Sequence, residues 1–423
     1  MPVDDPNAAP AAGPGDPAEP IPAITPLDQP RDGVPPVIDD QAGLSEYIAR
    51  LVEGTGPMAV DAERASGHRY GQRAFLVQVR REGASTALID PVALPDLNGL
   101  GAAMADVEWV VHAASQDLPC LGEVGMRPKL LFDTELGGRL AGLHRVGLAA
   151  MTQELLGMSL AKEHSAVDWS TRPLPEPWLR YAALDVEVLV QLRDAVASLL
   201  VEQGKLEWAM EEFAAIAAAP PAPPRVDPWR RTSGLHRIRD RRRLAAVREL
   251  WLMRDAIAQQ RDVSPGRVLP DSAIVEAAVA LPASVGALME LPGFSGRGAG
   301  RHARAWQQAI QLARAVPDDE LPAQHLPADG PPPPRVWTER EPAAAARLAA
   351  ARTALTGLAA ELTMPVENLL SPDSVRRLAW QPPQPHDSDS VGAALRALGA
   401  REWQIQLTAA VLSQALDGDP NPI

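Results

Sequence analysis

Short apolar runs near the start of the chain predict a sheet. They occupy residues 58–63, 74–80, 86–90 and 109–111. Apolar runs of this length are typical of strands, and the first two lie close enough in sequence to pair as a hairpin. The sequence that follows, to about residue 216, has mainly helical spacing. Strands that alternate with helices favour an α/β domain in which helices cover the sheet.

The second half of the chain has helical periodicity and one repeated pattern. Apolar residues recur every three or four positions through 241–260, the spacing of an amphipathic helix. A turn at 263–265 and a Leu-Pro-Asp sequence at 269–271 follow it. The same theme returns after residue 358, with Leu-Ser-Pro-Asp at 370–373. We therefore predict two related all-α domains.

Proline-rich segments separate the predicted domains. Residues 219–224 hold four prolines, and residues 331–334 are four prolines in succession. Such segments form stiff linkers. The predicted organisation is an acidic Pro-rich tail at 1–40, a large domain at 41–215, a linker at 216–235, a helical domain at 236–316, a linker at 317–335, a second helical domain at 336–416 and a tail at 417–423.

Charge is distributed unevenly along the chain. The net charge is −14, and residues 1–40 contribute −7 of it, because they hold eight acids and one basic residue. The same segment has eleven prolines, so it cannot bury a core and we expect it to be disordered. Residues 225–254, in contrast, contain ten arginines and three acids, a net charge of +7.

Cysteine usage and hydropathy restrict the compartment. Cys120 is the one cysteine, so no disulfide forms within the chain and a reducing cytosol is the expected location. We expect this thiol to be a small buried apolar group. No apolar run reaches the ~18 residues of a membrane span. The N-terminus also lacks the basic and apolar regions of a secretory signal.

Two pairs of polar residues have the spacing of one site. Asp61 and Glu63 lie two apart in a predicted strand, so their side chains point to the same face. Adjacent like charges are unfavourable unless a cation lies between them. Tyr181 and Asp185 lie four apart in a helical run, so they share a helix face. Each pair can therefore present its oxygens to one point.

A fifth residue, Asp117, follows the predicted strand at 109–111. It lies near a helix start for which Ser115 is the candidate cap. Functional sites of α/β sheets gather where strands end. With no cluster of Cys or His nearby, the hard oxygen ligands favour Mg²⁺ or Mn²⁺ over zinc.

The motifs around these acids resemble the DEDD superfamily of 3′–5′ exonucleases, and ribonuclease D within it. Their sequences are Met-Ala-Val-Asp-Ala-Glu at 58–63, His-Ala-Ala-Ser-Gln-Asp-Leu at 112–118, and Lys-Glu-His-Ser-Ala-Val-Asp-Trp-Ser-Thr-Arg-Pro-Leu at 162–174, which leads into 181–186. The resemblance implies a ribonuclease H-like mixed sheet with flanking helices. It also implies that the helical domains are HRDC modules, the second more diverged than the first.

The resemblance also assigns a subclass. Some members of the superfamily carry a histidine five residues before the last acid, where this chain has Arg180. Tyr181 stands four before it, as in the tyrosine subclass. Arg64, which follows Glu63, departs from the apolar residue of many relatives. This departure concerns local substrate contacts and leaves the expected metal site intact.

Two-metal hydrolysis of a phosphodiester is the chemistry that the resemblance implies. Asp61 is expected to bridge the two ions, Glu63 and Asp185 to hold the ion that binds the water, and Asp117 to help anchor the second. Tyr181 is expected to orient the water, because a phenol does not readily lose its proton near pH 7. The products would be nucleoside 5′-monophosphates.

Several basic residues are candidate nucleic-acid contacts, and each also has a structural interpretation. Lys162 and Arg172 could contact phosphate or order a loop beside Asp168 and Trp169, for which we favour structural roles. The net +7 segment could track a phosphate backbone or form a solvated helix face. Its candidate contacts are Arg239, Arg241, Arg242 and Arg243.

The sequence thus predicts a cytoplasmic, metal-dependent 3′–5′ exoribonuclease that acts as a monomer on structured RNA, such as tRNA precursors with 3′ trailers. Two alternatives remain at this point. One is a DNA exonuclease with the same chemistry, and the other is an RNA-binding protein that has lost catalysis. A helicase is excluded, because no Gly-x4-Gly-Lys-Ser/Thr loop for a nucleotide occurs in the chain.

Overall fold

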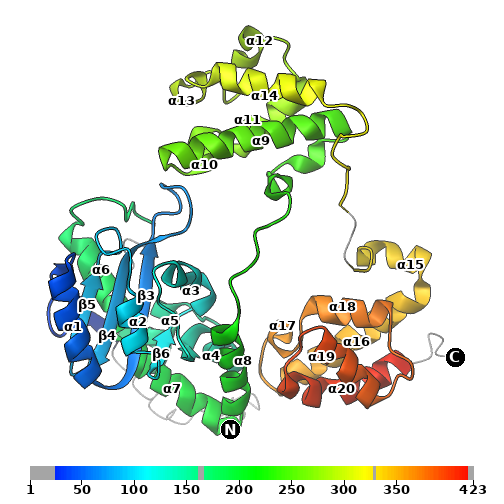
Figure 1. The fold of residues 1–423 in the computed structure, drawn as a ribbon. Coiled ribbons are helices and arrows are strands. Elements are labelled where there is room, and N and C mark those ends of the chain that lie inside the picture. The colour runs from blue at the N-terminus through cyan, green and yellow to red at the C-terminus, as the bar shows by residue number, and fades with distance from the viewer. Residues whose placement is uncertain (1–23, 161–165, 327–329, 418–423) are drawn as a thin grey trace, which may run out of the picture.

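The part of the chain that the structure describes forms three structural units (Figure 1). The computed structural model describes residues 24–160, 166–326 and 330–417. A sheet covered by helices forms the first unit, and two helical units follow it. Within the described residues, no helix is long and apolar enough to cross a membrane.

A six-stranded mixed sheet forms the centre of the first unit, with strand order β2-β5-β4-β3-β6-β7. The central strand β3 pairs antiparallel with β4 and parallel with β6. The strands of this sheet are β2 (Val37–Ile38), β3 (Thr55–Arg64), β4 (Ala74–Glu82), β5 (Ser85–Ile89), β6 (Glu108–Val111) and β7 (Leu130–Asp133). The four predicted strands and the mixed sheet are confirmed, whereas β2 and β7 were not predicted.

Helices flank both faces of the sheet. They are α1 (Gln41–Glu53), α2 (Asn98–Ala103), α3 (Ala114–Glu123), α4 (Thr134–Leu140), α5 (Leu148–Leu156), α6 (Glu176–Glu187), α7 (Leu189–Glu202) and α8 (Leu206–Ala218). Strand β3 shows how the two faces differ. Met58 and Val60 pack in the same core as α1, while Ala59 packs with Val186 and Leu189 of α6 and α7. By alternation, Asp61 and Glu63 lie on the α6 face.

Residues 24–40 correct one prediction. We expected 1–40 to be disordered, but β1 (Thr25–Leu27) pairs in parallel with β8 (Met158–Leu160), and β2 pairs with β5. The segment also carries charges used by the fold, because Arg31 Nε lies 3.3 Å from Glu187 Oε1. These pairings join residues far apart in sequence, which composition does not reveal. Residues 1–23 lie outside the described residues.

The first helical unit contains η1 (Pro228–Arg231), η2 (Leu235–Arg237), α9 (Arg241–Arg261), α10 (Pro265–Val268), α11 (Asp271–Ala280), α12 (Val285–Met289), α13 (Arg297–Gly300) and α14 (Ala303–Ala315). The predicted helix at 241–260 is confirmed. Trp229 is buried in this unit's core, so the unit begins before residue 236, inside the segment we predicted to be a linker.

The second helical unit contains η3 (Pro334–Val336), α15 (Trp337–Arg340), α16 (Pro342–Glu361), α17 (Val366–Leu369), α18 (Pro372–Trp380), α19 (Ser388–Ala397) and α20 (Glu402–Asp417). In both units a long helix is followed by a one-turn helix and then by a helix of about ten residues. Asp262, directly after α9, and Thr363, two residues after α16, both have positive φ, 47° and 48°. The repeated sequence pattern therefore corresponds to a repeated order of helices.

Both helical units contact the first unit. The loop between β3 and β4 receives the first helical unit: Ser264 N donates to His68 O at 3.0 Å, and Tyr70 Oη donates to Asp255 at 3.1 Å. On α8, Trp208 stacks on Trp403 of α20 with ring centroids 5.3 Å apart. The loop that follows Glu63 is thus also the contact site of a helical unit.

Candidate active site

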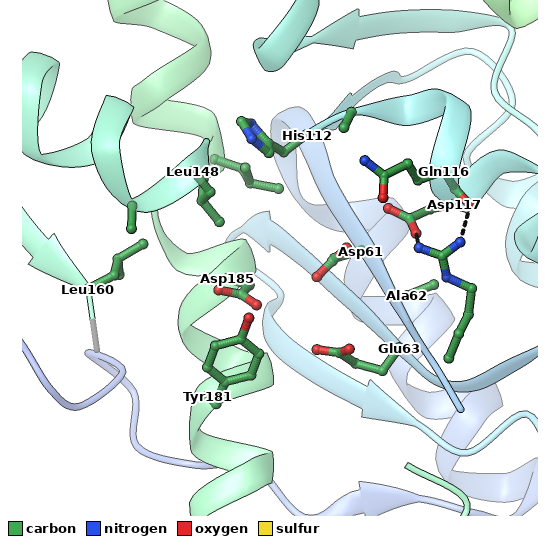
Figure 2. Close-up of a pocket in the computed structure, with 14 residues that line it drawn as sticks. Asp61, Ala62, Glu63, His112, Gln116, Asp117, Leu148, Leu160, Tyr181 and Asp185 are labelled. Atoms are coloured by element: carbon green, nitrogen blue, oxygen red, sulfur yellow. Dashed lines mark hydrogen bonds and ion pairs between the residues drawn. The ribbon is translucent and has the colours of Figure 1, made fainter. Parts of the chain in front are cut away.

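Three carboxylates converge at the end of β3. Asp61 and Glu63 project from the strand and Asp185 projects from α6, as Figure 2 shows. One oxygen from each of the three lies within 4.8 Å of the others. The sequence spacing predicted each pair separately, and the packing of α6 on β3 brings the pairs together.

Asp117 completes the acidic cluster from the opposite side of the pocket. It lies in the first turn of α3 and is 5% exposed. Figure 2 shows it beside Gln116, facing Asp61 across from the α6 side chains. Arg64 Nη2 lies 3.3 Å from Asp117 Oδ1, and Arg64 Nη1 donates to Gln116 O at 2.8 Å. The sequence related Arg64 to local substrate contacts and did not predict its pairing with Asp117.

The predicted cap of α3 is wrong. The N-cap position is Ala113, in the left-handed conformation with φ 61°, and no side chain of α3 itself caps the helix. Instead, Asp133 at the end of β7 accepts from Ala113 N at 3.0 Å and from Ala114 N at 2.9 Å. Because β7 was not predicted, this partner of the α3 N-terminus could not be identified from sequence.

Asp133 is also the N-cap of the next helix, α4. Its Oδ1 accepts from Glu135 N at 3.0 Å and from Leu136 N at 3.2 Å in the first turn of α4. One buried carboxylate thus satisfies orphan N–H groups of two helices. Burial raises the pKa of Asp133, and the backbone N–H groups of Leu136, Ala114 and Ala113 oppose that rise. Its contacts fix the backbone that carries Asp117.

Tyr181 lies beside Asp185 on the same face of α6, as predicted from their spacing, and its hydroxyl points toward Asp185 in Figure 2. Burial raises the pKa of Tyr181, and the charges of Asp185 and Glu63 raise it further. The phenol therefore stays protonated at neutral pH and presents a donor. Behind it, the fully buried Trp169 packs edge-on to Trp178, with ring centroids 5.7 Å apart. The structural role favoured for Trp169 is confirmed.

The electrostatics of the cluster match a cation site. Burial raises the pKa of all four acids, and that of Asp117 rises to about 8 because the Asp61 charge adds to burial. The charges of Asp61, Asp185 and Asp117 raise the pKa of Glu63 further. Carboxylates so close together repel unless a positive charge joins them. Since every donor is a hard oxygen, the residues fit a divalent cation of the Mg²⁺ or Mn²⁺ type.

The acids line one side of a cavity of about 530 Å³, and Leu148 and Leu160 line the other. His112 lies at its edge, with Nδ1 2.9 Å from Thr134 Oγ1. Burial lowers the pKa of His112 to about 4, so the imidazole is neutral at physiological pH. His112 is thus a partly buried histidine with a hydrogen-bond partner. Cys120, as expected, is buried, and burial raises its pKa to about 12.

The predicted nucleic-acid contacts differ in how their charges are used. Arg172 makes a bidentate pair with Asp90, at 2.7 and 2.8 Å, and donates to Phe75 O at 2.7 Å. Its guanidinium therefore joins β4 and the residue that follows β5 to the loop before α6. Lys162 lies outside the described residues.

Two of the four predicted arginine contacts in the first helical unit are bound internally. Arg241 donates to Leu321 O and Pro322 O. Arg242 donates to Ala313 O at 3.1 Å and to Val316 O, at the end of α14. Arg239 is exposed, and Arg243 pairs at 3.3 Å with the neighbouring Asp240. The basic segment is thus partly a set of helix-terminus contacts.

Family models divide the chain as the fold does. A 3′-5′ exonuclease family matches residues 35–200, an HRDC domain matches 243–310, and a 3′ to 5′ exonuclease C-terminal domain matches 330–416. The HRDC assignment of the first helical unit is confirmed. The second unit matches a family with another description, so its kinship with HRDC stays a prediction based on helix order.

Full-length relatives extend the likeness over most of the chain. The ribonuclease D of Gluconacetobacter diazotrophicus is 33% identical over 70% of this chain and 75% of that protein. The ribonuclease D of Escherichia coli is 31% identical over 66% of this chain and 75% of that protein.

Solved structures also resemble this chain over most of its length. A crystal structure of a protein from Bifidobacterium adolescentis matches with a TM-score of 0.85 and 40% identity, covering 93% of this chain and all of that one. The crystal structure of Escherichia coli RNase D, an exoribonuclease involved in structured RNA processing, matches with a TM-score of 0.66 and 25% identity over 90% of this chain and 98% of that one.

Proposed function

Because the chain belongs to the ribonuclease D family and is a 3′–5′ exoribonuclease, we propose that Asp61, Glu63, Asp117 and Asp185 bind two divalent cations, Mg²⁺ or Mn²⁺, at which single nucleotides leave the 3′ end of RNA. The observation that carries this proposal is the convergence of three carboxylate oxygens within 4.8 Å, beside a fourth buried acid. Divalent cations offset the repulsion within such a cluster.

Each acid has a role that follows from its position. Asp61 lies between the α6 side and the α3 side of the cluster, so it would bridge both cations. Glu63 and Asp185 would hold the cation on the α6 side, and Asp117 would help to hold the other. When bound, the two cations activate the attacking water and stabilise the leaving 3′ oxygen.

Tyr181 would orient the water through its hydroxyl. Burial and the neighbouring acids hold its pKa above the ordinary value, which supports a positioning role and argues against a role as general base. Water attacks the terminal phosphorus, and the bond between that phosphorus and the 3′ oxygen of the preceding nucleotide breaks. The products are a nucleoside 5′-monophosphate and an RNA that is one nucleotide shorter.

Structured RNA with short 3′ extensions, such as tRNA precursors, is the proposed substrate. The involvement of the Escherichia coli enzyme in structured RNA processing supports this class. The docking of the HRDC unit supports it too, because that unit contacts the loop between β3 and β4, which follows Glu63 in the chain (Figure 1). An RNA body held there could place its single-stranded 3′ end at the acids.

The test compares matched 5′-labelled substrates in Mn²⁺ and in Mg²⁺. These are a tRNA precursor with a short 3′ trailer, a single-stranded RNA and a DNA of the same sequence. We expect stepwise shortening of RNA from the 3′ end, with 5′-monophosphates as products and a pause at the mature tRNA end. Equal rates on DNA would instead favour a DNA exonuclease. Asp61→Asn serves as the matched inactive control.

A further inference from the structure

Arg64 reaches the acidic cluster from the last position of β3. Residues alternate between the two faces of a strand, so Arg64 starts from the face of Ala62, away from Glu63. The register with β4 shifts here from Glu63↔Leu76 to Arg64↔Ala74, which leaves Phe75 of β4 as the extra residue of a bulge. The Arg64 guanidinium nevertheless lies beside Asp117 in the first turn of α3. A cationic residue thereby enters a pocket of acids.

The Arg64 guanidinium is held at the cluster by two contacts. It pairs with Asp117 Oδ1 at 3.3 Å and donates to Gln116 O at 2.8 Å. The Arg64 side chain is 25% exposed and that of Asp117 7%, so water screens this pair only in part. Arg64 also lines a second hollow, with Gly67 and His68 of the β3–β4 loop, that adjoins the acidic pocket.

The net charge of the site shows how Arg64 affects cation binding. Four carboxylates carry four negative charges, which two divalent cations would neutralise. Arg64 then leaves the loaded site with one excess positive charge. A phosphodiester of RNA carries one negative charge. The arginine therefore disfavours the second cation in the free enzyme and favours the complex that also contains the phosphate.

We propose that Arg64 is a positioning residue that holds Asp117 and makes binding of the second cation depend on substrate phosphate. This inference rests on the proposed two-cation site. Asp117 is shared between the guanidinium and the cation on its side of the cluster. Without phosphate the guanidinium competes for that carboxylate, and with phosphate the extra positive charge is offset.

Calorimetric titration of Mn²⁺ into the full-length protein tests the proposal, with and without AMP as the phosphate probe. For the wild-type protein we expect one tight and one weak cation, and AMP should strengthen the weak one by at least about tenfold. In Arg64→Met the weak cation should bind about tenfold more tightly without AMP. The further effect of AMP in that variant should be less than about threefold.

Three variants separate charge from folding. Arg64→Lys keeps the charge and should behave like the wild type, whereas Arg64→Gln removes it and should behave like Arg64→Met if the latter folds poorly. Arg193→Met is the matched control, because Arg193 forms a partly buried pair with Glu108 at 2.8 Å outside the pocket. It should leave both cation affinities unchanged. Thermal melting of each variant reports folding.

The possible failures are distinguishable. If the wild-type protein binds no Mn²⁺, the proposed metal site is wrong and the inference falls with it. If it binds two cations but Arg64→Met and Arg64→Gln leave the weak affinity unchanged or lower it, the role of Arg64 alone is overturned. The same holds if Arg64→Lys behaves like the neutral variants, because then charge is not the cause.

Discussion

The acidic cleft and the arginine-rich segment contrast in how their charges are satisfied. In the cleft, Asp61, Glu63 and Asp185 face one another, and the positive charge that reaches the cluster is Arg64, bound to Asp117. In the first helical unit, Arg241 and Arg242 are bound to backbone carbonyls of the same unit. Charges held together without neutralisation indicate function, whereas charges already paired indicate structure.

The largest expected effect is the loss of activity when an acid of the cleft is neutralised. Asp61→Asn or Asp185→Asn removes a ligand charge with little change in volume, so kcat should fall by at least about a thousandfold in Mg²⁺ or Mn²⁺. The melting temperature in EDTA should stay the same or rise, because burial and repulsion destabilise these carboxylates. Single-turnover assays and melting curves measure both. Near wild-type activity in either variant would show that the acids are not the metal ligands.

Tyr181→Phe should have the next largest effect. Removing a hydroxyl that positions the water should lower kcat about a hundredfold, while Mn²⁺ affinity should stay within about twofold. Turnover assays and calorimetry make the comparison on the same preparation. A parallel loss of cation binding would make the phenol oxygen a ligand and contradict the positioning role.

Local spacing predicted the cleft well, because each half of the cluster lies within one element. Asp61 and Glu63 are two apart in a strand, and Tyr181 and Asp185 are four apart in a helix, so backbone geometry alone orients them. Three motifs in order, matched to a known superfamily, then implied that the halves meet. Asp117 was found in the same way, although its helix start was assigned to the wrong cap.

What could not be predicted depends on contacts between distant segments. Asp133 lies 20 residues from Ala113, and its side chain accepts a hydrogen bond from Ala113 N. Arg242 reaches Val316, 74 residues away. Strand β1 pairs with β8 from within a segment that composition alone marked as disordered. Arg64 at the end of β3 donates to Gln116 O, 52 residues away, and pairs with Asp117. Composition and periodicity carry no information about such partners.

Asp133→Ala extends the comparison between the cleft and the arginine-rich segment to a buried carboxylate whose oxygens already accept backbone hydrogen bonds. The variant leaves four backbone N–H groups of α3 and α4 without their acceptor. Loss of two caps should lower the free energy of unfolding by about 2–4 kcal/mol. Because α3 carries Asp117, kcat should fall as well, by about tenfold. Urea unfolding and turnover assays measure the two effects, and a stability change below about 0.5 kcal/mol would contradict the capping role.

The smallest and most selective effect concerns the arginines. Arg239 and Arg243 are the members of the predicted contact set that are not bound to distant parts of their own unit. Their double substitution by Ala should flatten the salt dependence of RNA binding by up to about two units of log–log slope, with little change in stability. Substitution of Arg241 and Arg242 should instead destabilise the first helical unit by about 1–3 kcal/mol and leave the slope unchanged.

Fluorescence anisotropy with one short RNA at several salt concentrations separates the two pairs, and urea unfolding provides the stability. If the first pair leaves the slope unchanged, the net +7 segment is a structural and solvated surface, and the RNA follows another path to the cleft. If the second pair changes the slope without loss of stability, arginines bound to carbonyls still contact phosphate. The contrast between neutralised and unneutralised charge would then not separate structural residues from functional ones.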